Sequence, residues 1–169
     1  MERFDREQFM QLLQVAGVKA RLRRELRLAP EKIDWDSNEL LAVGDRTGSQ
    51  GVIFIELEHR RYVLPYEVAH KTADKTGRAK PITCDFCYTW QRGGNAARVS
   101  FVRQSDRHIF NFLCCGDLRC SLHVRDKTPQ SRLSRTQLHE DIDVTGRIER
   151  LRHKLCQLLE LLELEPIVE

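Results

Sequence analysis

Four cysteines in two widely separated groups are the residues of this chain best suited to chemistry. Cys84 and Cys87 enclose two residues, and Cys115 and Cys120 follow after a long intervening stretch. A two-residue gap lets both thiolates of a turn point at one tetrahedral zinc ion, with zinc–sulfur distances of about 2.3 Å. The two groups bracket a predicted hairpin, and this combination indicates a zinc finger. We therefore predict one structural zinc ion on these four cysteines.

The second cysteine pair needs a sharp turn between its members. Two ligands spaced by five along one continuous helix would diverge by roughly 140°. We therefore expect Cys115 to end a strand and Cys120 to lie in the first turn of a helix, where backbone amides favour a thiolate. Gly116 is expected to permit the turn and Asp117 to cap the helix. A knuckle, a hairpin and ligands at a helix start are the layout of a treble clef.

Other side chains compete for the role of ligand. Cys114 should alternate to the opposite face of the strand from Cys115, so we assign it to the core. His123 could replace one thiolate, although the four cysteines already form a full set. Cys156 stands alone in the C-terminal segment and is predicted to be a small buried hydrophobe. Reduced core thiols without metal are the competing interpretation of the whole group.

The predicted coordination argues against catalysis at the metal. Four thiolates close the shell of a zinc ion and leave no open position for water or substrate. The sequence contains no phosphate-binding glycine loop, no helical HExxH and no convincing nucleophile with its base. Asp141 and Asp143 are assigned to a helix cap and to surface charge. We expect a binding module without a small-molecule substrate, not an enzyme.

Composition indicates a globular protein of the cytoplasm. The 169 residues are 41% hydrophobic and 31% charged, enough for one domain with a core or for a small domain with a helical appendage. The N-terminus carries charges where a signal peptide needs an apolar run, and no stretch reaches spanning length without charges. We thus expect a cytoplasmic location and no membrane partner. In that reducing compartment, cysteines serve more often as ligands or core thiols than in disulfides.

The charge distribution predicts one local basic patch. The formal net charge of +3 is too small to indicate nucleic acid by itself. Between residues 119 and 135, however, Asp126 alone opposes five basic side chains: Arg119, Arg125, Lys127, Arg132 and Arg135. The alternative interpretation of such a cluster is an ordinary solvated face.

The first thirty residues are predicted to form an N-terminal helix. Asp5 and Gln8 resemble a capping box, and apolar residues recur at approximately helical spacing as far as Leu26. Basic residues in its C-terminal half lie where the helix dipole favours them, and Pro30 follows as a stop. We take residues 1–30 as this helix and residues 31–169 as an α+β domain that contains the finger.

Between Ile33 and Thr83, short apolar runs separated by turn residues indicate a sheet. A hairpin is predicted from residues 52–57 and 62–64, with Pro65 interrupting its second strand. Residues 71–80 are predicted to be a loop or linker that leads to the cysteines.

The second half of the chain is predicted to alternate hairpin and helix. Residues 98–103 and 108–113 form a second hairpin, and residues 128–143 form a connection or a weak helix. Thr145 is available to cap an amphipathic C-terminal helix, whose apolar positions fall three and four apart: Ile148, Leu151, Leu155, Leu158 and Leu162. Packing of this helix on its own domain is favoured over a coiled-coil dimer, since the seam covers little more than two heptads. The predicted fold class is α+β, a treble-clef zinc finger with antiparallel hairpins between two helical ends.

The cysteine motifs also resemble a known family. Residues 84–87 read Cys-Asp-Phe-Cys, and residues 115–122 read Cys-Gly-Asp-Leu-Arg-Cys-Ser-Leu. These runs resemble the C-terminal treble-clef zinc-finger domain of the elongation-factor-G-binding proteins, the FusB/FusC-type fusidic acid resistance family. The resemblance extends from about Ile33 to His123 or beyond. The chain is short, with one predicted N-terminal helix where the resistance proteins have a helical bundle.

The resemblance implies a partner as well as a fold. It implies a zinc-binding protein that docks on translation elongation factor G and promotes release of the factor from the ribosome, including factor trapped by fusidic acid. It carries the zinc ligands over to Cys84, Cys87, Cys115 and Cys120.

Aromatic and arginine side chains often anchor interfaces. We therefore predict that the partner contacts the residues of these types around the finger: Phe86, Tyr88, Trp90, Arg119 and Arg125. Core packing is the alternative for Phe86 and Trp90.

A different function is a treble-clef module that binds RNA or DNA. It is motivated by Tyr88 and Trp90, which are interleaved with Arg92, Arg98 and Arg103. Ribosomal RNA would also bring nucleic acid within reach of a module that acts on the ribosome.

Overall fold

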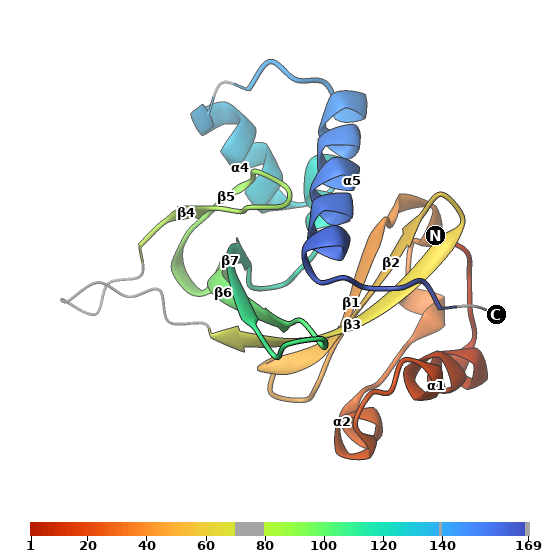
Figure 1. The fold of residues 1–169 in the computed structure, drawn as a ribbon. Coiled ribbons are helices and arrows are strands. Elements are labelled where there is room, and N and C mark those ends of the chain that lie inside the picture. Colours follow the sequence, from red (N-terminus) through yellow and green to blue (C-terminus); the bar gives the residue numbers. More distant parts are fainter. Residues whose placement is uncertain (70–79, 139, 168–169) are drawn as a thin grey trace.

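A computed structural model of the chain describes residues 1–69, 80–138 and 140–167 (Figure 1). At its centre lies an antiparallel five-stranded sheet in the order β1-β2-β3-β6-β7, and a separate pair joins β4 to β5. The fold is α+β, as predicted. The strands are β1 (Leu40–Gly44), β2 (Gln50–Leu57), β3 (Arg60–Ala69), β4 (Ile82–Thr83), β5 (Trp90–Gln91), β6 (Ala96–Val102) and β7 (Ile109–Cys115).

The described α-helices precede the sheet or follow β7. The described α-helices are α1 (Arg6–Val15), α2 (Ala20–Glu25), α3 (Cys120–Val124), α4 (Pro129–Leu138) and α5 (Val144–Leu161), and the short 3-10 helices are Pro30–Lys32, Trp35–Ser37 and Gly93–Asn95. Among the described residues, no helix is both long enough and apolar enough to span a membrane.

Side chains of the central strand β2 alternate between two hydrophobic cores. Ile53 and Ile55 join the core that contains the cysteines and α5. Val52 and Phe54 join the core formed with the N-terminal helices. All four are fully buried, as the two-residue period of a doubly covered strand requires. The two covers, α5 with the finger and the pair α1 and α2, therefore lie on opposite faces of the sheet (Figure 1).

Both predicted hairpins are present, as β2–β3 and β6–β7. The prediction that Pro65 interrupts the second strand is wrong, because Pro65 pairs with Val52 inside β3. β6 pairs with β3 only over Glu67–Ala69. Pro65 thus lies where one side of β3 has no ladder partner among the described residues, and its missing N–H is tolerated there. The loop predicted for residues 71–80 lies outside the described residues except for Lys80.

The N-terminal segment holds two helices where one was predicted. The capping box is confirmed, since Asp5 accepts from the N–H of Gln8 and the Gln8 side chain accepts from the N–H of Asp5. Gly17, with a φ of 66°, then ends α1 in the left-handed conformation that favours glycine. Pro30 does not stop α2, which has ended before Leu26, and instead begins a 3-10 helix.

The C-terminal helix is present and packs on its own sheet. Leu151, Leu155 and Leu158 are buried in the core beside the cysteines, as their spacing predicts. The N-cap is Asp143 rather than Thr145, because an Asp143 carboxylate oxygen accepts from the N–H of Gly146 at 2.8 Å. Cys156 is exposed, so its predicted burial is wrong. α4 occupies the segment for which a connection and a weak helix were both considered.

Candidate metal centre

The structure brings the four predicted sulfur atoms together. The Sγ atoms of Cys84, Cys87, Cys115 and Cys120 all lie within 4.8 Å of one another, and all four residues are buried. The Sγ atoms of Cys84 and Cys120 are 3.8 Å apart, those of Cys87 and Cys115 are 3.4 Å apart, and those of Cys115 and Cys120 are 3.5 Å apart. A tetrahedral zinc ion with ligands at 2.3 Å would hold its sulfurs about 3.8 Å apart. The donor set therefore fits zinc in both chemistry and size.

A closed turn between β4 and β5 presents the first two sulfurs. The N–H of Tyr88 donates to the carbonyl of Cys84 at 2.9 Å, and the N–H of Cys84 donates to the carbonyl of Thr89 at 3.1 Å. Tyr88 itself adopts a left-handed φ of 56°. These bonds close the chain back on itself and aim both thiols at one point.

The turn before α3 differs from its prediction. Cys115 ends β7 and Cys120 begins α3, as expected. The left-handed residue, however, is Leu118 with a φ of 50°, not Gly116. Asp117 is not the N-cap, which is Arg119, although its side chain accepts from the Arg119 N–H at 3.2 Å. The Asp117 carboxylate thus accepts a hydrogen bond from the backbone N–H of the cap residue, Arg119, whose own side chain makes no capping hydrogen bond.

Asn95 is a positioning residue that sequence reasoning missed. Its carbonyl accepts from the N–H of Gly116 at 2.7 Å, and its side-chain oxygen accepts from the N–H of Asp117 at 3.0 Å. Asn95 therefore ties the start of β6 to the turn that carries two of the sulfurs. Its place after two glycines indicates a turn but says nothing of what the turn holds.

His123 lies beside the cluster. Its Nδ1 is 3.2 Å from the Cys115 Sγ and 3.8 Å from the Cys87 Sγ, and its Nε2 is 3.5 Å from a carboxylate oxygen of Asp117. Burial lowers the pKa of His123, but its hydrogen bonds to Asp117 and Cys87 outweigh burial and raise the pKa to about 9. The Nδ1 of the ring thus faces the sulfurs, and its Nε2 faces the Asp117 carboxylate. Cys114, the other competing ligand, is fully buried outside the four-sulfur group, which confirms its assignment to the core.

When four thiols lie close together, the ionisation of one makes ionisation of the next less favourable. Burial raises the pKa of Cys84, but hydrogen bonds from neighbouring sulfurs outweigh it and hold that pKa well below 9.0. Burial and the hydrogen bond with Cys120 raise the pKa of Cys115 well above the same value. Neighbouring thiolates repel, so the first ionisation opposes the next. A divalent cation removes this conflict, because every thiolate then faces opposite charge.

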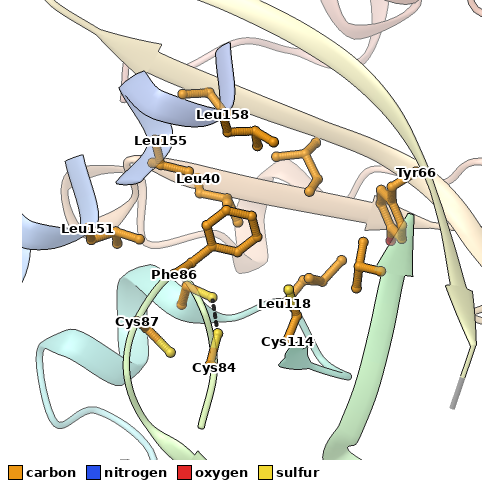
Figure 2. Packing of buried hydrophobic residues seen from close by; sticks show 14 of the residues in the cluster. Leu40, Tyr66, Cys84, Phe86, Cys87, Cys114, Leu118, Leu151, Leu155 and Leu158 are labelled. Carbon is orange, nitrogen blue, oxygen red and sulfur yellow. Dashed lines mark hydrogen bonds between the residues drawn. The ribbon is translucent and has the colours of Figure 1, made fainter. Parts of the chain in front are cut away.

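Apolar side chains of the sheet and α5 pack against the cysteine cluster. Phe86, between the first two cysteines, is 2% exposed, and its ring lies toward Leu40, Leu155 and Leu158 (Figure 2). Its ring centroid is 5.3 Å from that of Phe112. The predicted partner contact of Phe86 is therefore wrong, and its alternative, core packing, is what the structure shows.

The comparison with known families agrees with this geometry. The family model of the FBP C-terminal treble-clef zinc-finger matches residues 12–162. The chain belongs to this family. The match spans nearly the whole chain, from α1 to the end of α5, and so extends well beyond the region of the cysteine motifs. Together with the buried four-cysteine cluster, it indicates a single structural zinc in this FusB/FusC-type finger. No curated protein and no solved structure shows a significant match.

Three of the predicted contact residues reach the surface of the treble clef. Arg119 is exposed, and Tyr88 and Trp90 are half-buried. The guanidinium of Arg150 lies 4.2 Å from the centroid of the Tyr88 ring, and that of Arg92 lies 5.6 Å from the Trp90 ring. Both distances are typical of cation–π contacts, which hold the aromatic rings in place.

Arg125 has a structural role instead. It donates to both carboxylate oxygens of Glu39, at 2.8 and 2.6 Å, and to the carbonyl of Ser121 at 3.0 Å. The pair joins α3 to the residue before β1. Burial raises the pKa of Glu39, but Arg125 outweighs burial and leaves that pKa below 4.5. Because its guanidinium is occupied in this way, Arg125 is not a free anchor for a partner.

The predicted basic patch of the finger is largely neutralised. Lys127 pairs with Asp34 at 2.6 Å and Arg135 with Asp126 at 3.3 Å. Only Arg119 and Arg132 of the five basic residues lack a carboxylate partner within the described ranges. Arg103, invoked for nucleic acid, pairs with Asp106 at 2.6 Å. Three of the five members of the predicted patch are therefore neutralised, whereas Arg92 and Arg98 have no ion pair within the described ranges.

Proposed function

We propose that the chain binds translation elongation factor G through the surface of its zinc finger and promotes release of the factor from the ribosome. Membership of the FusB/FusC-type family over residues 12–162 is the observation that carries this proposal. The site chemistry supports a binding role rather than catalysis, since a zinc ion on four thiolates has no position left for a substrate. Such a role places the action of the protein in the cytoplasm.

The contact surface that we propose comprises Tyr88, Trp90 and Arg119. Tyrosine, tryptophan and arginine are the residue types that most often dominate binding energy. Tyr88 follows Cys87 directly, and the N–H of Trp90 donates to the Ser134 hydroxyl on α4 at 2.8 Å. Arg119 immediately precedes Cys120. Tyr88 and Arg119 lie in turns next to zinc ligands, and Trp90 begins the strand that leaves the first of these turns, so loss of the metal should disturb the whole surface.

Calorimetry with purified elongation factor G tests the proposal. The zinc-loaded full chain should bind, and Cys115→Ser should not, because the turn that carries Arg119 loses its ligand. Cys156→Ser is the matched control, since that cysteine is exposed and lies outside the cluster, and it should bind like the wild type. Absence of binding by the zinc-loaded wild type at micromolar concentrations would overturn the proposal.

A second pair of variants tests the contact surface. Arg119→Ala should weaken binding by about fivefold or more, as expected for an interface anchor. Arg98→Ala, at an exposed arginine on β6, should leave it unchanged. Equal effects would contradict the assignment of the interface to Tyr88, Trp90 and Arg119 and extend it to the hairpin. Sedimentation of ribosomes carrying factor trapped by fusidic acid tests release, for which the wild type should shift the factor to the free fraction.

A further inference from the structure

A hollow on the opposite face of the sheet from the zinc finger has an unusual lining. It lies between α1 and α2 and has a volume of about 440 Å³. Its apolar floor includes Phe9 and Leu26, which are 1% and 2% exposed and belong to the N-terminal core. Four arginines surround this floor and no acidic residue lines it: Arg6, Arg23, Arg24 and Arg27.

The charges of these arginines are not neutralised within the described part of the chain. None of the four forms an ion pair there, and the carboxylate of the nearby Glu25 is taken by Arg21 at 3.6 Å. The Arg23 Nε is buried and has no hydrogen-bond partner among the described residues. Burial of an unsatisfied guanidinium donor costs stability, and the Arg135 Nη2 on the finger face bears the same cost, so it is the missing ion pairs that set the hollow apart. On the finger face, by contrast, Arg125, Arg135 and Arg147 all meet carboxylates.

Helix electrostatics and capping explain three of these four arginines, but not Arg6. Arg23 and Arg24 lie in the last turn of α2, where a positive charge is favoured. Arg27 donates to the carbonyls of Arg24 and Leu26 at 2.8 and 3.1 Å, which gives it a capping role. Arg6, however, is the first residue of α1, where the helix dipole disfavours a positive charge. A shared anionic ligand would account for the position of Arg6 as well as for the other three.

The basic surface extends beyond the hollow. Residues 19–28 carry five positive charges, from Lys19 and four arginines, against Glu25, which gives +4 for ten residues when the whole chain carries +3. Lys19 and Arg21 are exposed and do not line the hollow. A small anion would need only the hollow, whereas a polyanion would use the whole row.

We propose that the surface formed by α1 and α2 binds single-stranded RNA. Arginine forks match phosphate groups in two-point contacts. Because Phe9 and Leu26 are buried, the accessible apolar surface of the hollow comes from Met10, which is 40% exposed, and from the half-buried Leu28. A single strand presents both phosphates and unstacked bases, whereas an acidic peptide presents charge without flat apolar groups. The site is separate from the proposed interface with elongation factor G and does not depend on it.

Fluorescence anisotropy with a labelled single-stranded RNA of about 12 nucleotides tests the proposal. The zinc-loaded full chain should bind with a log–log salt slope of about −2.8, since four phosphate contacts each contribute about −0.7. Arg24→Glu with Arg27→Glu should weaken binding at least about tenfold. Arg46→Glu with Arg60→Glu, at exposed arginines outside the hollow, changes the net charge equally and should weaken it less than about threefold.

A second variant guards against loss of folding, because Arg27 also caps α2. Arg6→Gln with Arg24→Gln leaves the side-chain contacts of Arg27 in place and should reduce the steepness of the salt slope by about 1.4. The two double variants of the hollow, Arg24→Glu with Arg27→Glu and Arg6→Gln with Arg24→Gln, should retain binding to elongation factor G. This result separates the present proposal from the preceding one. Equal losses in the hollow variant and its charge-matched control would overturn the site. The assignment of RNA as the ligand would be overturned if polyglutamate competed as effectively as RNA. It would also be overturned if DNA of the same sequence bound more tightly.

Discussion

Apart from α4 and α5, the elements that cover one face of the sheet are short and meet around sulfur, whereas those that cover the other interlock through aromatic rings. On the finger face, β4 and β5 have two residues each and α3 has five. On the N-terminal face, the Phe54 ring centroid lies 5.1 Å from that of Phe4 and 5.5 Å from that of Phe9. Elements of two to five residues cannot bury enough apolar surface to hold themselves.

The difference assigns separate sources of stability to the two faces. Zinc, together with buried ion pairs such as Arg125–Glu39, specifies the positions of side chains on the finger face. Apolar packing is the main support of the N-terminal face, and the four arginines of its hollow have no carboxylate partner among the described residues. Perturbations of the metal and of the aromatic cluster should therefore produce different patterns of damage.

Removal of the metal should have the largest effect and should be confined to one face at first. A strong chelator, or Cys115→Ser, should abolish hydrogen-exchange protection of the amides around Cys84 and Cys120, because binding free energy of structural zinc is folding free energy. Amides of β2 should lose less protection, since Val52 and Phe54 remain packed. Uniform loss along the chain would show that the faces are not independent.

Truncation in the aromatic cluster should reverse that pattern. Phe54→Ala removes a fully buried ring and should lower the free energy of unfolding by about 3–5 kcal/mol in guanidinium titrations. Zinc content per chain should stay at the wild-type value, because Phe54 belongs to the other core. Val15→Ala, at a residue 66% exposed, serves as the control and should cost less than about 0.5 kcal/mol. Zinc loss in Phe54→Ala would break the comparison.

The ion pair of the finger face should titrate in acid. Glu39→Gln leaves the guanidinium of Arg125 without its charge partner and should destabilise the protein by about 3 kcal/mol at neutral pH. The pKa of Glu39 is lowered in the folded state, so its stabilisation is present above pH 4.5 and is lost as the pH falls through the folded value. The difference between wild type and variant should shrink below pH 4.5 in unfolding titrations. A difference that stays constant there would contradict the assignment.

The smallest expected effect concerns the turn between α1 and α2. Gly17→Ala should cost about 1 kcal/mol, from backbone strain alone, because φ is 66° and a Cβ would meet nothing within 4 Å. Gly94→Ala has the same open surroundings without the positive φ and should be nearly neutral. Thermal unfolding of the two variants compares them directly, and equal stabilities would remove the assigned reason for the helix break.

Local rules were sufficient for the features that depend on spacing or period. Tetrahedral coordination explains why Cys84 and Cys87 belong together, and helical periodicity explains the buried row that includes Leu151 and Leu155. The alternating strands around the cysteines followed from β-branched and aromatic runs. In each case the residues that decide the structure are neighbours along the chain or repeat within it.

Features that depend on distant contacts could not be predicted in this way. From the sequence, Arg125 is assigned to a basic surface patch, because its partner Glu39 is 86 residues away and cannot be recognised as one. The role of Asn95 depends on the later turn at Gly116, and tolerance of Pro65 depends on how far β6 extends along β3. From the sequence, the arginines of the N-terminal segment are assigned to favourable interaction with the helix dipole. The hollow that they line forms only when α2 folds back beside α1.

Zinc K-edge X-ray absorption of the purified chain tests the central assignment most directly. Four buried cysteine sulfurs around one ion should give a first shell of sulfur alone at about 2.3 Å, with one zinc per chain. A shell with three sulfurs and one nitrogen would make His123 a ligand and contradict the four-cysteine site, and a natively folded chain without zinc would contradict the metal itself.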